Sequence, residues 1–92
     1  MVKIIVVFDV LEEYREVRDE LRRYLKDRGG FFRQYSVYEV DLPEREVSSF
    51  LRGIHRIIRK GAGRVEVLFP CSRCYSGIVE FDTYDSFSES VL

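Results

Sequence analysis

The segment Lys3–Phe8 constrains the fold of this chain more than any other feature of the sequence. It reads Lys-Ile-Ile-Val-Val-Phe, and its β-branched, nearly unbroken apolar character is typical of a buried strand that ends at Asp9. Because side chains alternate across a strand, apolar side chains point to both of its faces. Both faces of this strand therefore need a cover.

Periodicity in the apolar residues predicts the remaining elements. Apolar residues recur at helical spacing before Gly29-Gly30 and again after Pro43, and these two segments are expected to be helices. The other segments are rich in Phe, Tyr and Val, which is typical of strands. In chain order, we expect a helix over 12–28, one kinked strand or two short strands over 31–42, a helix of about seventeen residues from 43, a strand over 64–69 and a short strand over 78–81.

This order of elements favours an α+β fold, the ferredoxin-like βαββαβ sandwich, in which an antiparallel sheet carries both helices on one face. We expect residues 1–80 to form this single domain and residues 81–92 to form an acidic C-terminal tail. The helices leave the second face of the first strand uncovered, so we expect a homodimer packed sheet to sheet. The extra C-terminal strand at 78–81 is a candidate for pairing with the partner's sheet edge.

Length and charge narrow the function classes. A chain of 92 residues holds one domain with a thin core, which rules out a two-domain enzyme. The net charge of −1 argues against a typical nucleic-acid binder, but residues 80–92 hold four acids and no base. Residues 1–79 therefore carry fifteen bases and twelve acids, or +3. Twelve of the fifteen bases are Arg, whose planar guanidinium suits phosphate or a buried carboxylate.

The sequence also bears on location and on zinc binding. The apolar run near the N-terminus is too short to cross a membrane and lacks a secretory signal layout, so we expect no membrane contact and a cytoplasmic location. Cys71 and Cys74 form a single Cys-x-x-Cys, which is half of a zinc site. Three states stay open for this pair: reduced structural thiols, a disulfide, or a four-Cys zinc site built across a dimer.

Asp9 is the first candidate for chemistry, because it follows the buried strand directly and stands between Phe8 and Val10. A structural interpretation is that its carboxylate caps the first helix or a turn at the strand end. The functional hypothesis is a magnesium ligand. One carboxylate is too few to hold the metal, but a two-fold axis near the strand end would bring two Asp9 side chains together. Dimerisation would then assemble the site.

Arginines form two further candidate groups. The first predicted helix has a basic face, where Arg15 and Arg18 are the better candidates because they lie nearest to Asp9. Interleaved acids also allow this face to be a solvated, salt-bridged surface. The second predicted helix has a basic stripe with no acid between residues 47 and 65, which indicates contact with a phosphate backbone without sequence reading. The stripe consists of Arg52, Arg56 and Arg59, with His55 beside them.

Several of these features occur together in one known family. An apolar strand ending in Phe8-Asp9 is followed by an Arg-containing helix, by the segment Arg33-Gln34-Tyr35-Ser36-Val37-Tyr38-Glu39, and by Pro43-Glu44 before a basic amphipathic helix. Over residues 2 to about 74, this pattern closely resembles the CRISPR-associated Cas-two family. The segment Pro70-Cys71-Ser72-Arg73-Cys74 resembles a variant of a strand end in the same family.

The resemblance implies a ferredoxin-like homodimer that acts in CRISPR adaptation, the acquisition of spacers. In that family the dimer sits between two dimers of the Cas-one integrase and holds the incoming DNA, and some members cleave single-stranded RNA or double-stranded DNA with magnesium. The metal-binding aspartate of the family corresponds to Asp9, and its helix-one arginine corresponds to Arg15 or Arg18. Ser36 and Tyr38 fall in the segment beside the dimer cleft, where the resemblance implies contact with nucleic acid.

Two positions depart from the family pattern. Phe8 stands where the family usually has Tyr, which removes a hydroxyl that could orient the carboxylate. Arg33, a further candidate for binding nucleic acid, directly precedes Gln34, whereas many members have an apolar residue between the two. Because a one-residue offset in a strand reverses the face, we expect Arg33 to point away from the cleft.

These observations lead to one function and two alternatives. The leading hypothesis is a homodimeric adaptation subunit that binds nucleic acid and cleaves RNA or DNA phosphodiester bonds with magnesium at paired Asp9, which makes it an endonuclease. The first alternative is a non-catalytic scaffold that bridges Cas-one integrase dimers and duplex DNA. A weaker alternative is a toxin-like ribonuclease of the same fold.

Overall fold

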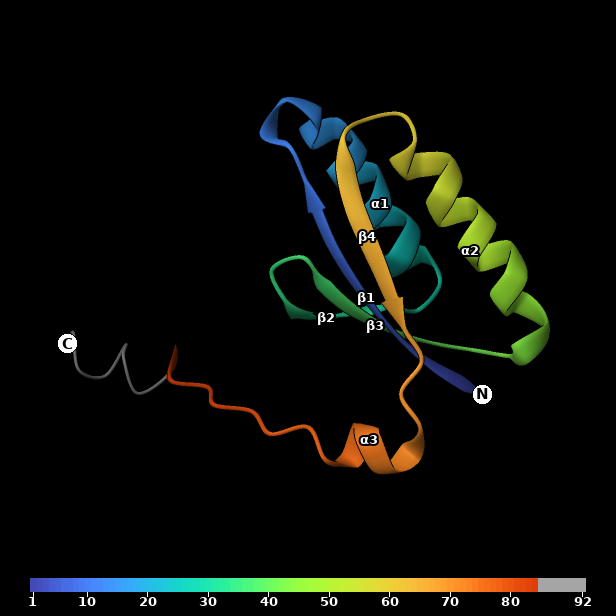
Figure 1. Ribbon diagram of the computed structural model, residues 1–92, viewed down its shortest axis with the longest axis vertical. Coiled ribbons are helices and arrows are strands. Elements are labelled where there is room, and N and C mark those ends of the chain that lie inside the picture. The colour runs from blue at the N-terminus through green and yellow to red at the C-terminus, as the bar shows by residue number, and fades with distance from the viewer. Residues whose placement is uncertain (85–92) are drawn as a thin grey trace.

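The computed structural model describes residues 1–84 of the chain (Figure 1). Its elements follow the predicted order as far as the fourth strand, and the segment 31–42 forms two short strands. The elements are β1 (Val2–Val10), the short 3-10 helix η1 (Glu12–Tyr14), α1 (Arg15–Asp27), β2 (Phe31–Gln34), β3 (Val37–Leu42), α2 (Glu44–Ile58), β4 (Gly63–Leu68) and α3 (Ser72–Ser76).

One antiparallel sheet with the strand order β2-β3-β1-β4 forms the frame of the fold. β1 lies inside the sheet and pairs with β3 on one side and with β4 on the other. α1 and α2 lie side by side and pack on one face of the sheet (Figure 1). This arrangement confirms the expected α+β, ferredoxin-like fold.

The helix-covered face of the sheet holds the core. Every second side chain of β1 points to this face, and Ile4, Val6 and Phe8 are at most 2% exposed. Burying an apolar side chain of this size contributes about 1.5–3 kcal/mol, so this layer supplies much of the driving force for folding. The other members of the core cluster are Val10, Val17, Leu21, Leu25, Tyr38, Val40, Leu42, Phe50, Ile54 and Ile57.

The contact between α1 and α2 depends on a glycine. Gly53 is buried in α2, and a Cβ at this position would overlap the ring of Tyr24 on α1. The Tyr24 hydroxyl donates a hydrogen bond of 3.1 Å to the Phe50 carbonyl. The rings of Tyr24 and Phe50 stack with their centroids 5.8 Å apart. The missing side chain therefore makes room for a tyrosine that ties the two helices together.

A two-residue turn joins β2 to β3 and contacts the end of β1. Ser36 in this turn takes a left-handed backbone with a φ of 70°, which costs a residue with a side chain about 1–2 kcal/mol. The Ser36 carbonyl accepts a hydrogen bond of 3.0 Å from the Phe8 N–H. The turn is thereby fixed to the carboxyl end of β1.

The C-terminal part of the described chain corrects one prediction. Residues 78–81 form no strand, because the chain forms α3 and then continues without regular secondary structure (Figure 1). A strand exists only where its backbone finds a partner ladder, and within this single chain residues 78–81 pair with neither edge of the sheet.

Other predictions about the chain as a whole stay predictions. Residues 85–92 of the expected acidic tail lie outside the described residues, and the boundary at residue 80 and the sheet-to-sheet homodimer are untested. Over residues 1–84, no helix combines the length and the hydropathy that crossing a membrane requires.

Candidate functional site

The sheet face opposite α1 and α2, here called the open face, carries the candidate site. It confirms that the first strand is apolar on both sides: Ile5 and Val7 point to this face and are only partly buried, and Leu68 beside them is 48% exposed. The open-face residues of β1, β3 and β4, matched in register, are Lys3, Ile5, Val7, Asp9, Val37, Glu39, Asp41, Arg64, Glu66 and Leu68.

Asp9 lies exposed at the carboxyl end of β1, opposite Arg64 of β4 in the register. Among residues 1–84 its carboxylate has no hydrogen-bond or ion-pair partner, and the Arg64 guanidinium lies 3.7 Å from Glu66 instead. The capping interpretation is wrong, because the N-cap residues of η1 and α1 are Leu11 and Tyr14. The carboxylate is thus free on the open face.

The donor chemistry of Asp9 fits one half of a magnesium site. Magnesium prefers oxygen ligands and usually keeps several water molecules while one or two carboxylates bind it. Within the described part of the chain, no three acidic, His or Cys side chains gather into a group that could hold a metal ion. A single copy therefore offers one carboxylate for such a site.

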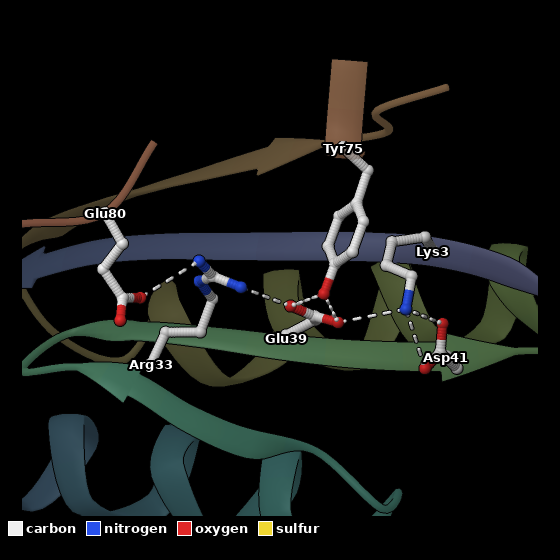
Figure 2. Close-up of polar contacts among 6 residues, drawn as sticks. All are labelled: Lys3, Arg33, Glu39, Asp41, Tyr75 and Glu80. Carbon is white, nitrogen blue, oxygen red and sulfur yellow. Dashed lines mark hydrogen bonds and ion pairs between the residues drawn. The ribbon is translucent and has the colours of Figure 1, made fainter. Parts of the chain in front are cut away.

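Glu39 is the centre of a polar cluster on the same face (Figure 2). Its side chain is only 1% exposed. The carboxylate accepts hydrogen bonds of 3.0 Å from Lys3 Nζ, 2.8 Å from Arg33 Nη1, and 2.8 and 2.9 Å from the Tyr75 hydroxyl. Burial alone would raise the pKa of Glu39, but these donors outweigh it and hold the pKa below its ordinary value.

The Glu39 cluster fixes α3 to the sheet. Tyr75 belongs to α3, and its hydroxyl reaches down to the Glu39 carboxylate while Lys3 Nζ lies 4.5 Å from the centre of its ring (Figure 2). Sequence reasoning missed both residues. An acid between the apolar Tyr38 and Val40 was a usable signal for Glu39, whereas no pattern marks Tyr75.

Arg33 lies on the open face, so the prediction that it points away is wrong. The register between β2 and β3 shifts between Phe32 and Gln34. This irregularity turns the Arg33 side chain back to the open face, although its one-residue offset in the sequence would place it on the other face. The Arg33 guanidinium is occupied, since it lies 2.8 Å from Glu39 and 3.8 Å from Glu80 (Figure 2). Its first role in this chain is to neutralise Glu39.

The structure corrects the assignment of Tyr38 and leaves Ser36 at the margin of the site. Tyr38 pairs in register with Val6, so its side chain points into the core and is 2% exposed. Its ring stacks on Phe8 at 6.1 Å, which excludes contact of this side chain with nucleic acid in the folded chain. Ser36 is partly buried in the turn next to β1, near Asp9, and its carbonyl is already hydrogen-bonded.

The two arginines predicted on α1 differ in their surroundings. Arg15 is the first residue of α1 and is exposed, and no ion-pair partner for it occurs in residues 1–84. Arg18 is 16% exposed, and its Nη1 donates a hydrogen bond of 3.1 Å to Glu12. Arg15 is therefore available to an incoming phosphate, whereas Arg18 is held by Glu12.

The basic stripe of α2 lies on the other side of the molecule from Asp9. Arg52, Arg56 and Arg59 are exposed on the face of α2 that points away from the buried Phe50 and Ile54, and α2 covers the face of the sheet opposite Asp9. The described part of the chain provides no ion-pair partner for these three arginines. One copy therefore presents two separate candidate surfaces, an acidic position and a basic stripe.

Cys71 and Cys74 are free and exposed. Cys71 is the N-cap of α3, where its Sγ accepts a hydrogen bond of 3.4 Å from the Cys74 N–H. This backbone hydrogen bond and one from the Cys74 thiol lower the pKa of Cys71. Within one copy the two thiols are not bonded to each other and Cys71 helps to start α3, and the disulfide and the zinc site across a dimer stay untested.

Comparison with known proteins agrees with this arrangement. The family model described as CRISPR associated protein Cas2 matches residues 1–78. Among solved structures, Streptococcus pyogenes Cas2 at pH 6.5 has a TM-score of 0.73 and 18% identity, covering 87% of this chain and 99% of that one. The hypothetical protein TT1823 from Thermus thermophilus has a TM-score of 0.66 and 26% identity, covering 87% and 88%. No curated protein matches the sequence.

The structural likenesses establish the fold, and the family model establishes the family. That model spans Asp9 and the segment 33–39, on which the resemblance of the sequence rests. The chain therefore belongs to the CRISPR associated protein Cas2 family, which is the Cas-two family of the sequence comparison.

Proposed function

We propose that this protein is a cytoplasmic homodimer that binds nucleic acid in CRISPR adaptation and cleaves phosphodiester bonds with magnesium at paired Asp9 carboxylates. Membership of a family involved in CRISPR adaptation supports the biological role. The observation that carries the proposed chemistry is the Asp9 carboxylate, exposed and without a partner among residues 1–84, at the carboxyl end of an inner strand.

The open face supports a dimer. Ile5, Val7 and Leu68 leave apolar surface on a sheet face that α3 covers only in part, and a second copy of the same face would remove this surface from water. In a two-fold dimer each residue of the interface meets its own counterpart or a reciprocal partner. An axis near the end of β1 would place the two Asp9 side chains together.

The chain's own residues have separate tasks in this proposal. The paired Asp9 side chains hold the ion, and the exposed Arg15 at the start of α1 offers a guanidinium to the negative charge that develops on the phosphate. Arg18, held by Glu12, stiffens the first turns of α1. When bound, magnesium supplies positive charge at the phosphodiester and makes a coordinated water molecule more acidic.

The stripe of Arg52, Arg56 and Arg59 supports binding rather than chemistry. Exposed arginines contact phosphates irrespective of base sequence, and such contacts release counterions, so affinity falls steeply as salt rises. We therefore expect duplex DNA to bind along α2 with little sequence preference.

Cleavage assays with matched Asp9 variants test the proposal. Wild type, Asp9→Ala and Asp9→Asn are incubated with labelled single-stranded RNA and duplex DNA, with and without magnesium, after each protein has been shown to be dimeric. We expect magnesium-dependent cleavage by wild type and none by either variant. If the variants cleave as fast as wild type, Asp9 is not the site, and if no protein cleaves, the nuclease proposal is wrong.

A scaffold without catalysis is the second candidate, and the separation of Asp9 from the α2 stripe favours it. The stripe on α2 lies outside the open face proposed for the dimer, so a dimer can hold duplex DNA there without using the Asp9 carboxylates. Under this proposal, changing Arg52, Arg56 and Arg59 to Glu abolishes spacer capture with the integrase while Asp9→Ala leaves it unchanged. The reverse result would favour the nuclease.

A further inference from the structure

The turn between β2 and β3 carries an exposed aromatic ring on a cationic support. Tyr35 is 66% exposed, and the guanidinium carbon of Arg22 on α1 lies 4.5 Å from the centre of its ring. A stacked guanidinium holds a ring in place without covering all of it. The ring is therefore ordered and accessible at the same time, a combination that core packing does not explain.

Two arginines of α1 near this ring, Arg18 and Arg22, have hydrogen-bond donors without an acceptor in residues 1–84. Arg18 Nε and Arg22 Nη2 are both shielded from water and have no acceptor among the described residues. The Asp19 carboxylate lies 3.8 Å from Arg18 Nε and 3.8 Å from Arg22 Nη1, which is beyond a hydrogen bond. Because buried donors normally find an acceptor, this corner of the molecule suits a ligand that brings anionic oxygen.

A groove beside Tyr35 suits a flat, uncharged ring. The groove has a volume of about 650 Å³, within the usual range for small-ligand sites. Its aromatic lining consists of Phe32, Tyr35, Phe81 and Tyr84, all strongly exposed. Glu80, Asp82 and Arg33 also line it, and Arg33 pairs with Glu80 at 3.8 Å, so the lining keeps a net negative charge and a phosphate is unfavourable inside the groove. A base of a nucleic acid fits in the groove, with the sugar-phosphate backbone outside it, beside Arg18 and Arg22.

The turn is also close to the candidate metal ligand. The Ser36 carbonyl accepts its 3.0 Å hydrogen bond from the Phe8 N–H, and Asp9 is the next residue along β1. The turn that carries Tyr35 is thus hydrogen-bonded to the residue that precedes Asp9. In a duplex the base faces are already stacked, so an aromatic platform can act only on an unpaired base.

We propose that Tyr35, supported by Arg22, is a stacking platform for an unpaired base. The inference rests on the proposed function in one respect only, that the ligand is a nucleic acid. Base stacking on an aromatic ring tolerates any base, so the platform reads strand state rather than sequence.

Binding without cleavage tests the platform. A single-stranded oligonucleotide that contains 2-aminopurine, and the same strand in a duplex, are titrated with full-length protein in EDTA. We expect wild type to quench the single-stranded probe on binding. Tyr35→Leu should weaken binding of the single strand roughly tenfold to hundredfold and lose the quenching, while Tyr35→Phe stays within about twofold and the duplex is unaffected by either change.

Each other result overturns the platform. Equal affinity of Tyr35→Leu and wild type for the single strand overturns it while nucleic-acid binding stands. An equal loss for single strand and duplex makes Tyr35 a general contact, and a change in dimerisation makes it an interface residue. If neither oligonucleotide binds to wild type, the proposed function fails together with the platform.

Discussion

The two faces of the sheet are closed in different ways. On the helix side, side chains of β1, β3, α1 and α2 form one contiguous apolar cluster. On the open face, one end is closed by the buried carboxylate of Glu39 and its donors from Lys3, Arg33 and Tyr75, while the apolar Leu68 stays accessible.

This difference separates the forces that specify the fold from those that arrange the site. Apolar burial is strong and without direction, so the helix side supplies stability. Burying a carboxylate costs desolvation energy, which hydrogen bonds offset only when their donors are well placed. The Glu39 cluster therefore mainly fixes the position of α3. Substitutions should therefore unfold the protein from one side and alter it locally from the other.

The largest expected effect lies on the helix side. Phe50→Ala removes a ring that is 1% exposed, and the cavity should lower the free energy of unfolding by about 3–5 kcal/mol. Denaturant unfolding measures this loss. The matched control is Phe31→Ala on β2, whose ring is 50% exposed and which should cost clearly less. Equal losses would erase the distinction between the two faces.

The next effect lies in the polar cluster. Glu39→Gln keeps the shape of the side chain but removes its charge, and we expect a loss of about 2 kcal/mol in the free energy of unfolding at neutral pH, as for hydrogen bonds to charged groups. Asp41→Asn is the control, because Asp41 shares Lys3 but is 40% exposed. A cost no greater than that of the control would show that burial adds nothing at Glu39.

Acid should remove the advantage of Glu39. Its pKa is lowered in the folded state, so its contribution is present above the ordinary pKa of a glutamate, about 4.3, and is lost as pH falls through the lower folded value. The difference in unfolding free energy between wild type and Glu39→Gln should therefore shrink below about pH 4. A difference that is constant from pH 7 to pH 3 contradicts the ionised cluster.

Removal of the hydroxyl that holds α3 should have a smaller and more local effect. Tyr75→Phe removes the hydroxyl proton that the two Glu39 oxygens share, at a cost of about 1 kcal/mol, and should speed amide exchange in Ser72–Ser76 more than in α2. Tyr14→Phe is the control, since no hydrogen bond of its hydroxyl is found in the described residues. Unchanged exchange in α3 would mean that other contacts hold it.

The smallest expected effect on stability is at Asp9. Its carboxylate has no partner within residues 1–84, so Asp9→Ala should change the free energy of unfolding by less than about 0.5 kcal/mol. Thermal unfolding of the dimer measures this. Together with loss of cleavage, such a small change would mark Asp9 as a residue kept for chemistry. A loss above 2 kcal/mol would instead make it structural.

Most of the fold could be predicted from sequence because local patterns of apolar residues indicate its strands and helices. The unbroken apolar run in Lys3–Phe8 predicted a buried strand and the helical spacing after Pro43 predicted an amphipathic helix, and both predictions are confirmed. α3 escaped prediction because five residues are too few to show a helical period. The segment 78–81 was expected to pair with the sheet edge of a second copy, and within one copy it finds no partner strand.

The candidate site was harder to predict, because it depends on register. Asp9 was found from its position after a strand, and the structure leaves it exposed there. Arg33 and Tyr38 were both placed wrongly for a reason that one sequence does not show: an irregularity in β2 turns Arg33 to the open face, and pairing with Val6 turns Tyr38 into the core. Glu39 emerged only once its three donors were brought together.

The position of Asp9 on an inner strand has a consequence for how activity is controlled. The backbone of Asp9 is fixed by the ladder to β4 and by the hydrogen bond from Phe8 to the turn, so each copy carries a rigid half of the proposed site. Assembly of the dimer therefore costs little conformational entropy at this position. The remaining barrier is the meeting of two molecules. Below the dissociation constant of the dimer, the rate of cleavage should then rise with the square of protein concentration, so that the abundance of the chain itself sets whether the reaction runs.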